Sequence, residues 1–218
     1  MTRLIIFDCD GVLVDTEQRA NDRMAEIFSG MGAPMSGAEC RARFQGQTME
    51  DVCEQVTQLA GLAPDPALPA TVRGEVDLVL ATGVEPVAGV AELIAFLDER
   101  SIPFCVGSSG SIAKMHITLG QSGLLDRLRD VLFSAQDIGR GKPHPDVFLH
   151  AAEAMGYSCR DAVVLEDSIS GVQAGIAAGA RVLGYCGDPF TNADDLRAAG
   201  ADIFHDMNAV PRILDLAP

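Results

Sequence analysis

The sequence lacks the features that mark membrane-spanning, secreted and nucleic-acid-binding proteins. No apolar run approaches the roughly 18 residues that a membrane-spanning helix needs. The apolar run near the start, Leu4–Phe7, is too short for the hydrophobic region of a signal peptide. Lysine and arginine form no cluster, and the formal net charge of −15 disfavours nucleic acid as a partner. We therefore expect a cytoplasmic protein with neither membrane nor nucleic-acid partners.

The cysteines also lack a recognisable pattern. No Cys-x-x-Cys pair occurs, and the six thiols are scattered along the chain at Cys9, Cys40, Cys53, Cys105, Cys159 and Cys186. This spacing predicts neither a disulfide framework nor a zinc site. We expect reduced, mostly buried thiols.

The composition does allow a substantial folded core. Hydrophobic residues make up 48% of the 218 residues, enough for one large domain or for a core domain with a smaller insert. The net charge of −15 repels anions, so a site for a phosphorylated molecule must supply local positive charge from a metal ion or a lysine.

Short apolar runs alternate with longer amphipathic segments over most of the chain. The strand-like runs are rich in Val, Ile and Phe and cover Leu4–Phe7, Pro103–Gly107, Val131–Phe133, Ala162–Leu165, Arg181–Tyr185 and Asp202–Phe204. Helical periodicity fills the intervals at Val87–Glu99, Ser111–Gln121, Pro145–Met155 and Ile169–Ala178. Near-continuous apolar strands separated by helices predict a doubly wound α/β core with a parallel, Rossmann-like sheet.

One interval breaks this alternation. Residues 16–83 contain no strand-like run but four helical patterns, near Glu17–Gly30, Ser36–Phe44, Met49–Ala60 and Pro66–Ala81. A helical block between the first strand and the rest of the sheet predicts an inserted all-helical cap domain over residues 16–83. Residues 1–15 and 84–218 then form the α/β core.

Polar residues follow the predicted strands where each strand ends. In chain order they are Asp8 and Asp10 after the first run, Ser108 and Ser109 after the second, Lys142 between the third and fourth, and Glu166 and Asp167 after the fourth. Ligands of an open parallel sheet bind outside the carboxyl ends of its strands. We therefore expect these side chains to converge on one site.

The chemistry of this set points to phosphoryl transfer. Crowded carboxylates are costly unless a cation lies among them, and oxygen ligands without His or Cys favour Mg²⁺. Mg²⁺ would let Asp8 attack a phosphoryl group whose oxygens are held by Lys142, by the Ser108 hydroxyl and by the backbone amide of Ser109. Protonated Asp10 would donate to the leaving group and then, as a carboxylate, activate the water that cleaves the aspartyl phosphate.

These segments resemble the motifs of the haloacid dehalogenase-like hydrolase superfamily. Residues 8–17, DCDGVLVDTE, are similar to its first motif, and Ser108 falls where the second motif has Ser or Thr. Residues 141–146, GKPHPD, resemble the third motif and residues 163–171, VVLEDSISG, the fourth. The helical insert resembles the cap of the branch that includes β-phosphoglucomutase and many sugar-phosphate phosphatases.

The resemblance implies roles for these residues. Asp8 is implied as the nucleophile and Asp10 as the acid/base. Mg²⁺ is implied to be held by Asp8, the main-chain carbonyl of Asp10, and Asp167, with Glu166 either a direct ligand or a neighbour of the ligands. Dehalogenases of the superfamily lack the second aspartate of the first motif, so Asp10 argues against dehalogenation.

The predicted cap bears on the substrate. Its segment RFQGQTM, residues 43–49, resembles the substrate-specificity loop of this branch, but Gln45 and Met49 stand where a β-phosphoglucomutase has basic residues around the glycine. This departure favours hydrolysis over a mutase reaction. The glutamines are candidates to bind sugar or polyol hydroxyls and the arginines a second anionic group. The candidate cap contacts are Arg19, Arg43, Gln45, Gly46 and Gln47.

We therefore predict a Mg²⁺-dependent phosphatase for a small organic phosphate monoester. A phosphomutase of the β-phosphoglucomutase type is the alternative within the same chemistry. A non-catalytic phospho-acceptor module, like response-regulator receivers, is the alternative of another class. Receivers are much shorter, have no helical insert and need no acid/base at the position of Asp10. We expect a monomer or a weak homodimer.

Overall fold

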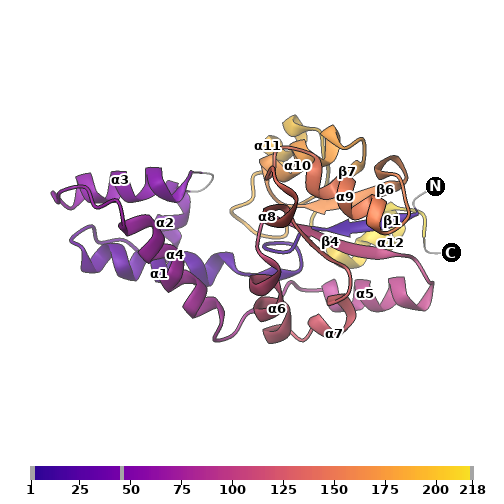
Figure 1. The fold of residues 1–218 in the computed structure, drawn as a ribbon, viewed down its shortest axis with the longest axis horizontal. Helices are drawn as coiled ribbons and strands as arrows, with labels where there is room; N and C mark the ends of the chain where they lie inside the picture. Colours follow the sequence, from indigo (N-terminus) through magenta and orange to yellow (C-terminus); the bar gives the residue numbers. More distant parts are fainter. Residues whose placement is uncertain (1–2, 45–46, 217–218) are drawn as a thin grey trace. The chain divides into compact units, whose positions relative to one another are not determined.

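The computed structural model describes residues 3–44 and 47–216. These residues divide into two compact units, one formed by the chain up to Asp15 and from Glu85 onward and the other by Thr16–Val84. Figure 1 shows strands and helices in the first unit and helices in the second. Each unit buries a hydrophobic cluster of its own.

A parallel sheet forms the centre of the first unit. Within the described residues it has six strands in the order β5-β4-β1-β6-β7-β8. Their bounds are β1 Leu4–Phe7, β4 Phe104–Ser108, β5 Leu132–Ser134, β6 Ala162–Glu166, β7 Arg181–Tyr185 and β8 Asp202–Phe204. Phe7 at the end of β1 is paired with Val106 of β4 and with Leu165 of β6. The carboxyl ends of three adjacent strands therefore lie level with one another.

Helices cover both faces of this sheet, which confirms the predicted doubly wound α/β core. Figure 1 shows α9, α10 and α11 on one face and α5, α6 and α7 on the other. On the first face, alternate strand residues such as Ile6 and Val164 pack with Phe148 of α9 and Val172 of α10. The helix bounds are α5 Val90–Glu99, α6 Ile112–Gln121, α7 Leu125–Leu128, α8 Ala135–Ile138, α9 Asp146–Ala154, α10 Ile169–Ala177, α11 Ala193–Ala199 and α12 Val210–Ile213. All four residues of β1 are fully buried, as a strand covered on both faces must be.

The second unit contains helices and no strand within its described residues. It contains α1 Glu17–Gly30, α2 Gly37–Phe44, α3 Met49–Leu59 and α4 Leu68–Leu80. Phe28 and Phe44 meet edge to face with 6.0 Å between ring centroids, and Val56 and Val72 belong to the same buried cluster. Thr48 caps α3 by accepting a hydrogen bond from the backbone N–H of Asp51. The helices lie where the sequence pattern predicts them.

Two short antiparallel strands, which the sequence pattern does not reveal, pair where the chain leaves the first unit and where it returns to it. Strand β2, Val14–Asp15, pairs with β3, Glu85–Pro86. The segment after β1 reaches β2 through a tight turn, in which the N–H of Gly11 donates to the carbonyl of Val14 at 2.8 Å. This turn carries the Asp8–Asp10 segment.

Two helices of the α/β unit differ from the sequence prediction. Helix α5 begins at Val90 rather than Val87 because Gly89, with φ of +83°, breaks the helical backbone just before it. Helix α11, which was not predicted, starts after Asn192, whose side chain accepts a hydrogen bond from the N–H of Asp194.

All six cysteines are free and buried, as predicted. In the described part of the chain, every helix is too short or too polar to cross a bilayer.

Candidate active site

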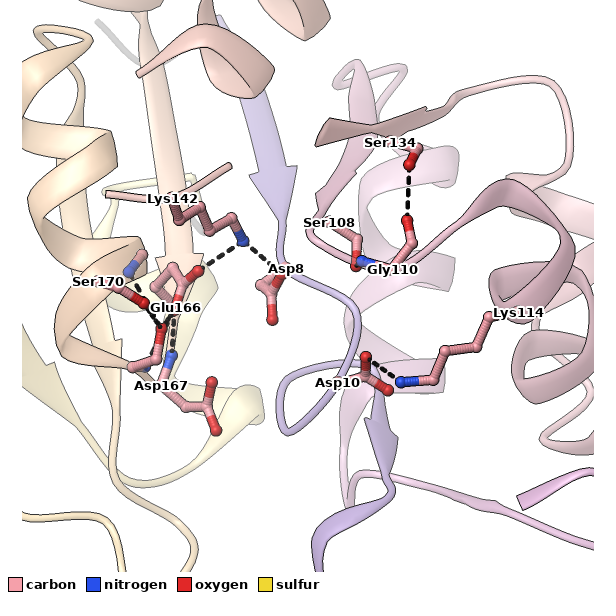
Figure 2. Close-up of polar contacts among 12 residues, drawn as sticks. Asp8, Asp10, Ser108, Gly110, Lys114, Ser134, Lys142, Glu166, Asp167 and Ser170 are labelled. Atoms are coloured by element: carbon pink, nitrogen blue, oxygen red, sulfur yellow. Dashed lines mark hydrogen bonds and ion pairs between the residues drawn. The ribbon is translucent and has the colours of Figure 1, made fainter. Parts of the chain in front are cut away.

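The central strands of the sheet end in a cluster of charged side chains (Figure 2). Asp8 directly follows β1, and Glu166 is the last residue of the neighbouring strand β6. The backbone N–H of Asp8 donates to the carbonyl of Leu165 at 2.9 Å, so the β1–β6 pairing continues to the nucleophile candidate. Asp8 is 8% exposed and Glu166 is fully buried. Burial at this level requires partners for both charges.

Lys142 bridges these two carboxylates. Its Nζ lies 2.5 Å from Oδ1 of Asp8 and 2.7 Å from Oε1 of Glu166, and it sits 4.7 Å from the centroid of the Phe148 ring. Burial alone would lower the pKa of Lys142, but the two carboxylates outweigh burial and raise that pKa above its ordinary value. Lys142 therefore stays positively charged.

Both carboxylate oxygens of Glu166 accept hydrogen bonds. Oε1 accepts from Lys142, and Oε2 accepts from the backbone N–H groups of Asp167 and Ser168 at 3.0 Å and from the Ser168 hydroxyl at 2.9 Å. Gly171 in α10 leaves the room for this carboxyl group, since a Cβ there would lie 1.8 Å from its Cδ. Of the two roles left open for Glu166, this geometry favours holding Lys142 and the start of α10 over direct metal coordination.

The donor set fits a hard divalent cation. Carboxylate oxygens of Asp8, Glu166 and Asp167 all lie within 4.8 Å of one another. Gly11, with φ of +82°, lets the turn approach Asp167 so closely that a Cβ on this residue would lie 2.0 Å from Oδ2 of Asp167. Oxygen ligands without nitrogen or sulfur suit ions such as Mg²⁺. Three of the four carboxylates that the sequence places at this edge therefore lie together.

Electrostatics at Asp8 also favour a bound cation. Burial raises the pKa of the Asp8 carboxyl from 3.8 to about 7, although the positive charge of Lys142 acts in the opposite direction. The negative charge of Glu166 adds to the rise. A nucleophilic aspartate has to be a carboxylate, and a cation beside Asp8 would favour that form.

The loop after β4 is held so that its polar groups have fixed directions. Ser108 is buried, and its Oγ accepts from the N–H of Gly110 at 3.0 Å, which leaves the hydroxyl proton to donate elsewhere. The Ser134 hydroxyl donates to the carbonyl of Gly110 at 2.7 Å, as Figure 2 shows, and Gln136 donates to the carbonyl of Ser109 at 3.1 Å. Because a peptide N–H points away from its C=O, these bonds also orient the amides of the loop.

Asp10 lies on the same turn but has a different partner. Its Oδ2 accepts a hydrogen bond from Nζ of Lys114 at 2.9 Å, and Lys114 stands in the first turn of α6. Figure 2 shows this pair across the turn from Asp8 and Lys142. Each aspartate of the segment therefore contacts a different lysine. Asp8 contacts Lys142, and Asp10 contacts Lys114 of α6.

The structure brings together most of the predicted site of the α/β unit. Asp8, Lys142, Glu166 and Asp167 form one cluster, and Ser108 ends the strand next to β1. Sequence reasoning assigned no role to Lys114, Ser134, Gln136 or Ser168. Ser168 lies within the fourth motif at the N-cap position of α10, and this is the signal that could have found one of them.

The predicted cap contacts belong to the helical unit. Arg19 donates to the Thr82 hydroxyl at 3.0 Å, and Gln47 donates to the carbonyl of Arg43 at 3.1 Å. Gln47 also accepts a hydrogen bond from Gln55 at 2.5 Å. The two other candidates, Gln45 and Gly46, lie outside the described residues.

The chain also matches known proteins. Residues 2–179 match the family model of the haloacid dehalogenase-like hydrolases. The 6-phosphogluconate phosphatase of Escherichia coli strain K12 is 32% identical over 186 residues, which cover 85% of this chain and 83% of that protein. More than half of the chain is therefore described by one family.

Solved structures agree with this match. A conserved haloacid dehalogenase-like protein of unknown function from Agrobacterium tumefaciens is 34% identical with a TM-score of 0.88, over 99% of both chains. A putative β-phosphoglucomutase from Thermotoga maritima has a TM-score of 0.82 at 24% identity over 100% of both chains, a likeness of fold. The predicted family, fold class and hydrolase class are thereby confirmed. The chain belongs to the haloacid dehalogenase-like hydrolase family.

Proposed function

We propose that this protein is a Mg²⁺-dependent phosphatase that hydrolyses a small organic phosphate monoester through an aspartyl phosphate on Asp8. The observation that carries the proposal is the buried contact of Lys142 with Asp8 and Glu166, beside the carboxylate of Asp167. Phosphoryl transfer to an aspartate requires a nucleophilic carboxylate next to fixed positive charge. The similarity to a 6-phosphogluconate phosphatase supports a sugar phosphate or a related ester as the substrate.

The proposed reaction has two halves that use the same pair of aspartates. An oxygen of Asp8 attacks the phosphorus while the bond from phosphorus to the ester oxygen breaks, and the Asp10 carboxyl gives its proton to the departing oxygen. Water then attacks the phosphorus of the aspartyl phosphate, Asp10 takes a proton from that water, and the bond from Asp8 to phosphorus breaks. The products are an alcohol and inorganic phosphate, and both aspartates return to their starting states.

In the proposed reaction, the fixed polar groups around Asp8 bind the phosphoryl group. The charge of Lys142, the Ser108 hydroxyl and the backbone amide of Ser109 hold its oxygens as charge shifts. Glu166 acts on this site through Lys142. A fixed ammonium and fixed amide groups need little rearrangement during the reaction, which is the basis of their stabilising effect.

Asp8, Asp167 and the main-chain carbonyl of Asp10 are the proposed ligands of Mg²⁺. When bound, the ion supplies positive charge that lets an anionic nucleophile meet an anionic phosphoryl group. The oxygen-only donor set and the pKa of Asp8, raised by burial to about 7, support a cation at this position.

The helical unit is the proposed cap, which selects the substrate. It is inserted directly after the segment that carries both aspartates, so the chain ties it to the reacting groups. Glutamine and arginine side chains suit sugar hydroxyls and a second anionic group. The proposed contacts are Arg19, Arg43, Gln45, Gly46 and Gln47.

Phosphate release from a panel of sugar, polyol, aldonate and nucleotide phosphates tests the reaction and the substrate class. We expect release from sugar-type esters with Mg²⁺ and loss of release with a chelator. Isomerisation of a hexose phosphate without net phosphate release would instead identify a phosphomutase. Membership of a hydrolase family argues against the receiver-like alternative.

Two experiments test the nucleophile directly. Asp8→Asn should abolish turnover while leaving the fold and much of the substrate binding intact, because it removes a reacting oxygen but keeps the side-chain shape. Trifluoroberyllate with Mg²⁺ should form an adduct on Asp8 that mimics the aspartyl phosphate. An adduct on another residue, or normal turnover by Asp8→Asn, would contradict the assignment.

A further inference from the structure

The use of lysine in this chain is unusually restricted. Fourteen of the 16 basic residues are arginine, and the remaining two are Lys114 and Lys142. Each of these lysines contacts one aspartate of the Asp8–Asp10 segment, Lys142 at Asp8 and Lys114 at Asp10. The proposed reaction assigns a task to Lys142 and none to Lys114.

Lysine and arginine bind a carboxylate in different ways. The planar guanidinium of arginine tends to engage both carboxylate oxygens, whereas the lysine ammonium is a compact charge that binds at one point. Lys114 contacts Oδ2 of Asp10 at 2.9 Å. A single point of contact fixes the orientation of the carboxyl group without enclosing both of its oxygens.

Lys114 is held in place by the same loop that carries Ser108. The backbone N–H of Lys114 donates to the side chain of Ser111, which caps α6. The chain passes close to the pair at Gly110, where a Cβ would lie 3.5 Å from Cδ of Lys114 and 3.8 Å from Oδ2 of Asp10. The position of Lys114 is therefore set by the β4–α6 loop, the proposed phosphate-binding loop.

We propose that Lys114 is a positioning residue, which holds the carboxyl group of Asp10 in the direction of the departing ester oxygen. The inference rests on the proposed function, because it assumes that Asp10 is the acid/base. In Figure 2 the pair lies on the opposite side of the turn from the Lys142 cluster, so the two lysines act on different groups of one reaction. Lys142 meets the phosphoryl group, and Lys114 acts through Asp10.

A merely structural role for Lys114 predicts a different result. The side chains of Lys114 and Asp10 are 32% and 28% exposed, and an ion pair that solvent reaches in this way contributes little to stability. Removing the charge of Lys114 should therefore leave the fold intact. If Lys114 positions Asp10, the loss of rate in the variant should be larger for leaving groups that need a proton more. A merely structural role predicts the same loss of rate for every leaving group.

The experiment compares Lys114→Met with the wild-type enzyme on simple phosphate esters of decreasing leaving-group acidity, from para-nitrophenyl through phenyl to benzyl phosphate. Acid catalysis is worth most for poor leaving groups and least for para-nitrophenol. We expect kcat/KM for benzyl phosphate to fall by about tenfold or more, within the range that general acids contribute, and for para-nitrophenyl phosphate to change little. The dependence of log kcat/KM on leaving-group pKa becomes steeper.

Two further variants separate the explanations. Ile117→Met, an exposed position on the same helix, is the matched control and should behave like the wild type. In an Asp10→Ala background, Lys114→Met should have no additional effect, because it acts through Asp10. An equal loss on all esters, or a full additional loss without Asp10, overturns the role of Lys114. A wild-type enzyme that releases phosphate neither from these esters nor from the sugar, polyol, aldonate and nucleotide phosphates overturns the proposed function as well.

Discussion

Replacing Lys142 with methionine removes a positive charge from the interior of the α/β unit and keeps a side chain of similar length. The lysine is only 4% exposed, and its ammonium contacts Asp8 at 2.5 Å and Glu166 at 2.7 Å. Breaking a buried pair by removing one partner costs about 3–5 kcal/mol, because the other charge stays buried without compensation. We expect Lys142→Met to lower the free energy of unfolding of the metal-free protein by about this amount.

Lys114→Met is the matched comparison, since it removes the other lysine of the chain from an aspartate two residues away. Its pair with Asp10 is partly exposed, so the expected loss is about 0–1 kcal/mol. Urea unfolding followed by circular dichroism measures both losses in one metal-free buffer. Losses of equal size in the two variants would refute the reasoning that burial decides the contribution of each lysine.

Two more predictions concern the same cluster. Because burial raises the pKa of Asp8 from 3.8 to about 7, the contribution of Asp8 to the stability of the metal-free protein is present in full below pH 3.8 and is lost as the pH rises through 7. Mg²⁺ competes with the proton for this carboxylate, so the increase in Tm caused by Mg²⁺ should grow across that window, and a constant increase would contradict it. Gly171→Ala should displace the Glu166 carboxyl, since a Cβ would lie 1.8 Å from its Cδ. We expect it to cost about 1–3 kcal/mol in urea unfolding and to lower phosphatase activity, whereas unchanged activity would show that Glu166 does not support Lys142.

The convergence of Asp8, Glu166 and Asp167 was predictable because parallel strands deliver their carboxyl ends to one edge of a sheet. The apolar runs of β1, β6 and β7 are buried on both faces, so hydrophobicity alone marks them. Short elements are different. The pair β2–β3 has two residues in each strand and lacks the length at which a period can be recognised.

Contacts made by long side chains could not be predicted in the same way. The partner of Lys114 depends on the rotamer of a side chain in the first turn of α6, and nothing in the spacing of residues 10 and 114 indicates their contact. The role of Glu166 was left open for the same reason. The oxygens of Glu166 accept hydrogen bonds from Lys142 and Ser168. How tightly the carboxyl group is enclosed is evident only from its packing against Gly171.

The antiparallel pairing of β2 with β3 has a consequence for how members of such a family can diversify. Asp15 pairs with Glu85, so the chain leaves the α/β unit and returns to it at neighbouring points. An insertion that starts and ends at one pair of facing residues can be lengthened, shortened or exchanged without changing the register of the main sheet. Grafting a different insert between these two residues should therefore alter which ester is accepted while the turn that bears the aspartates keeps its geometry.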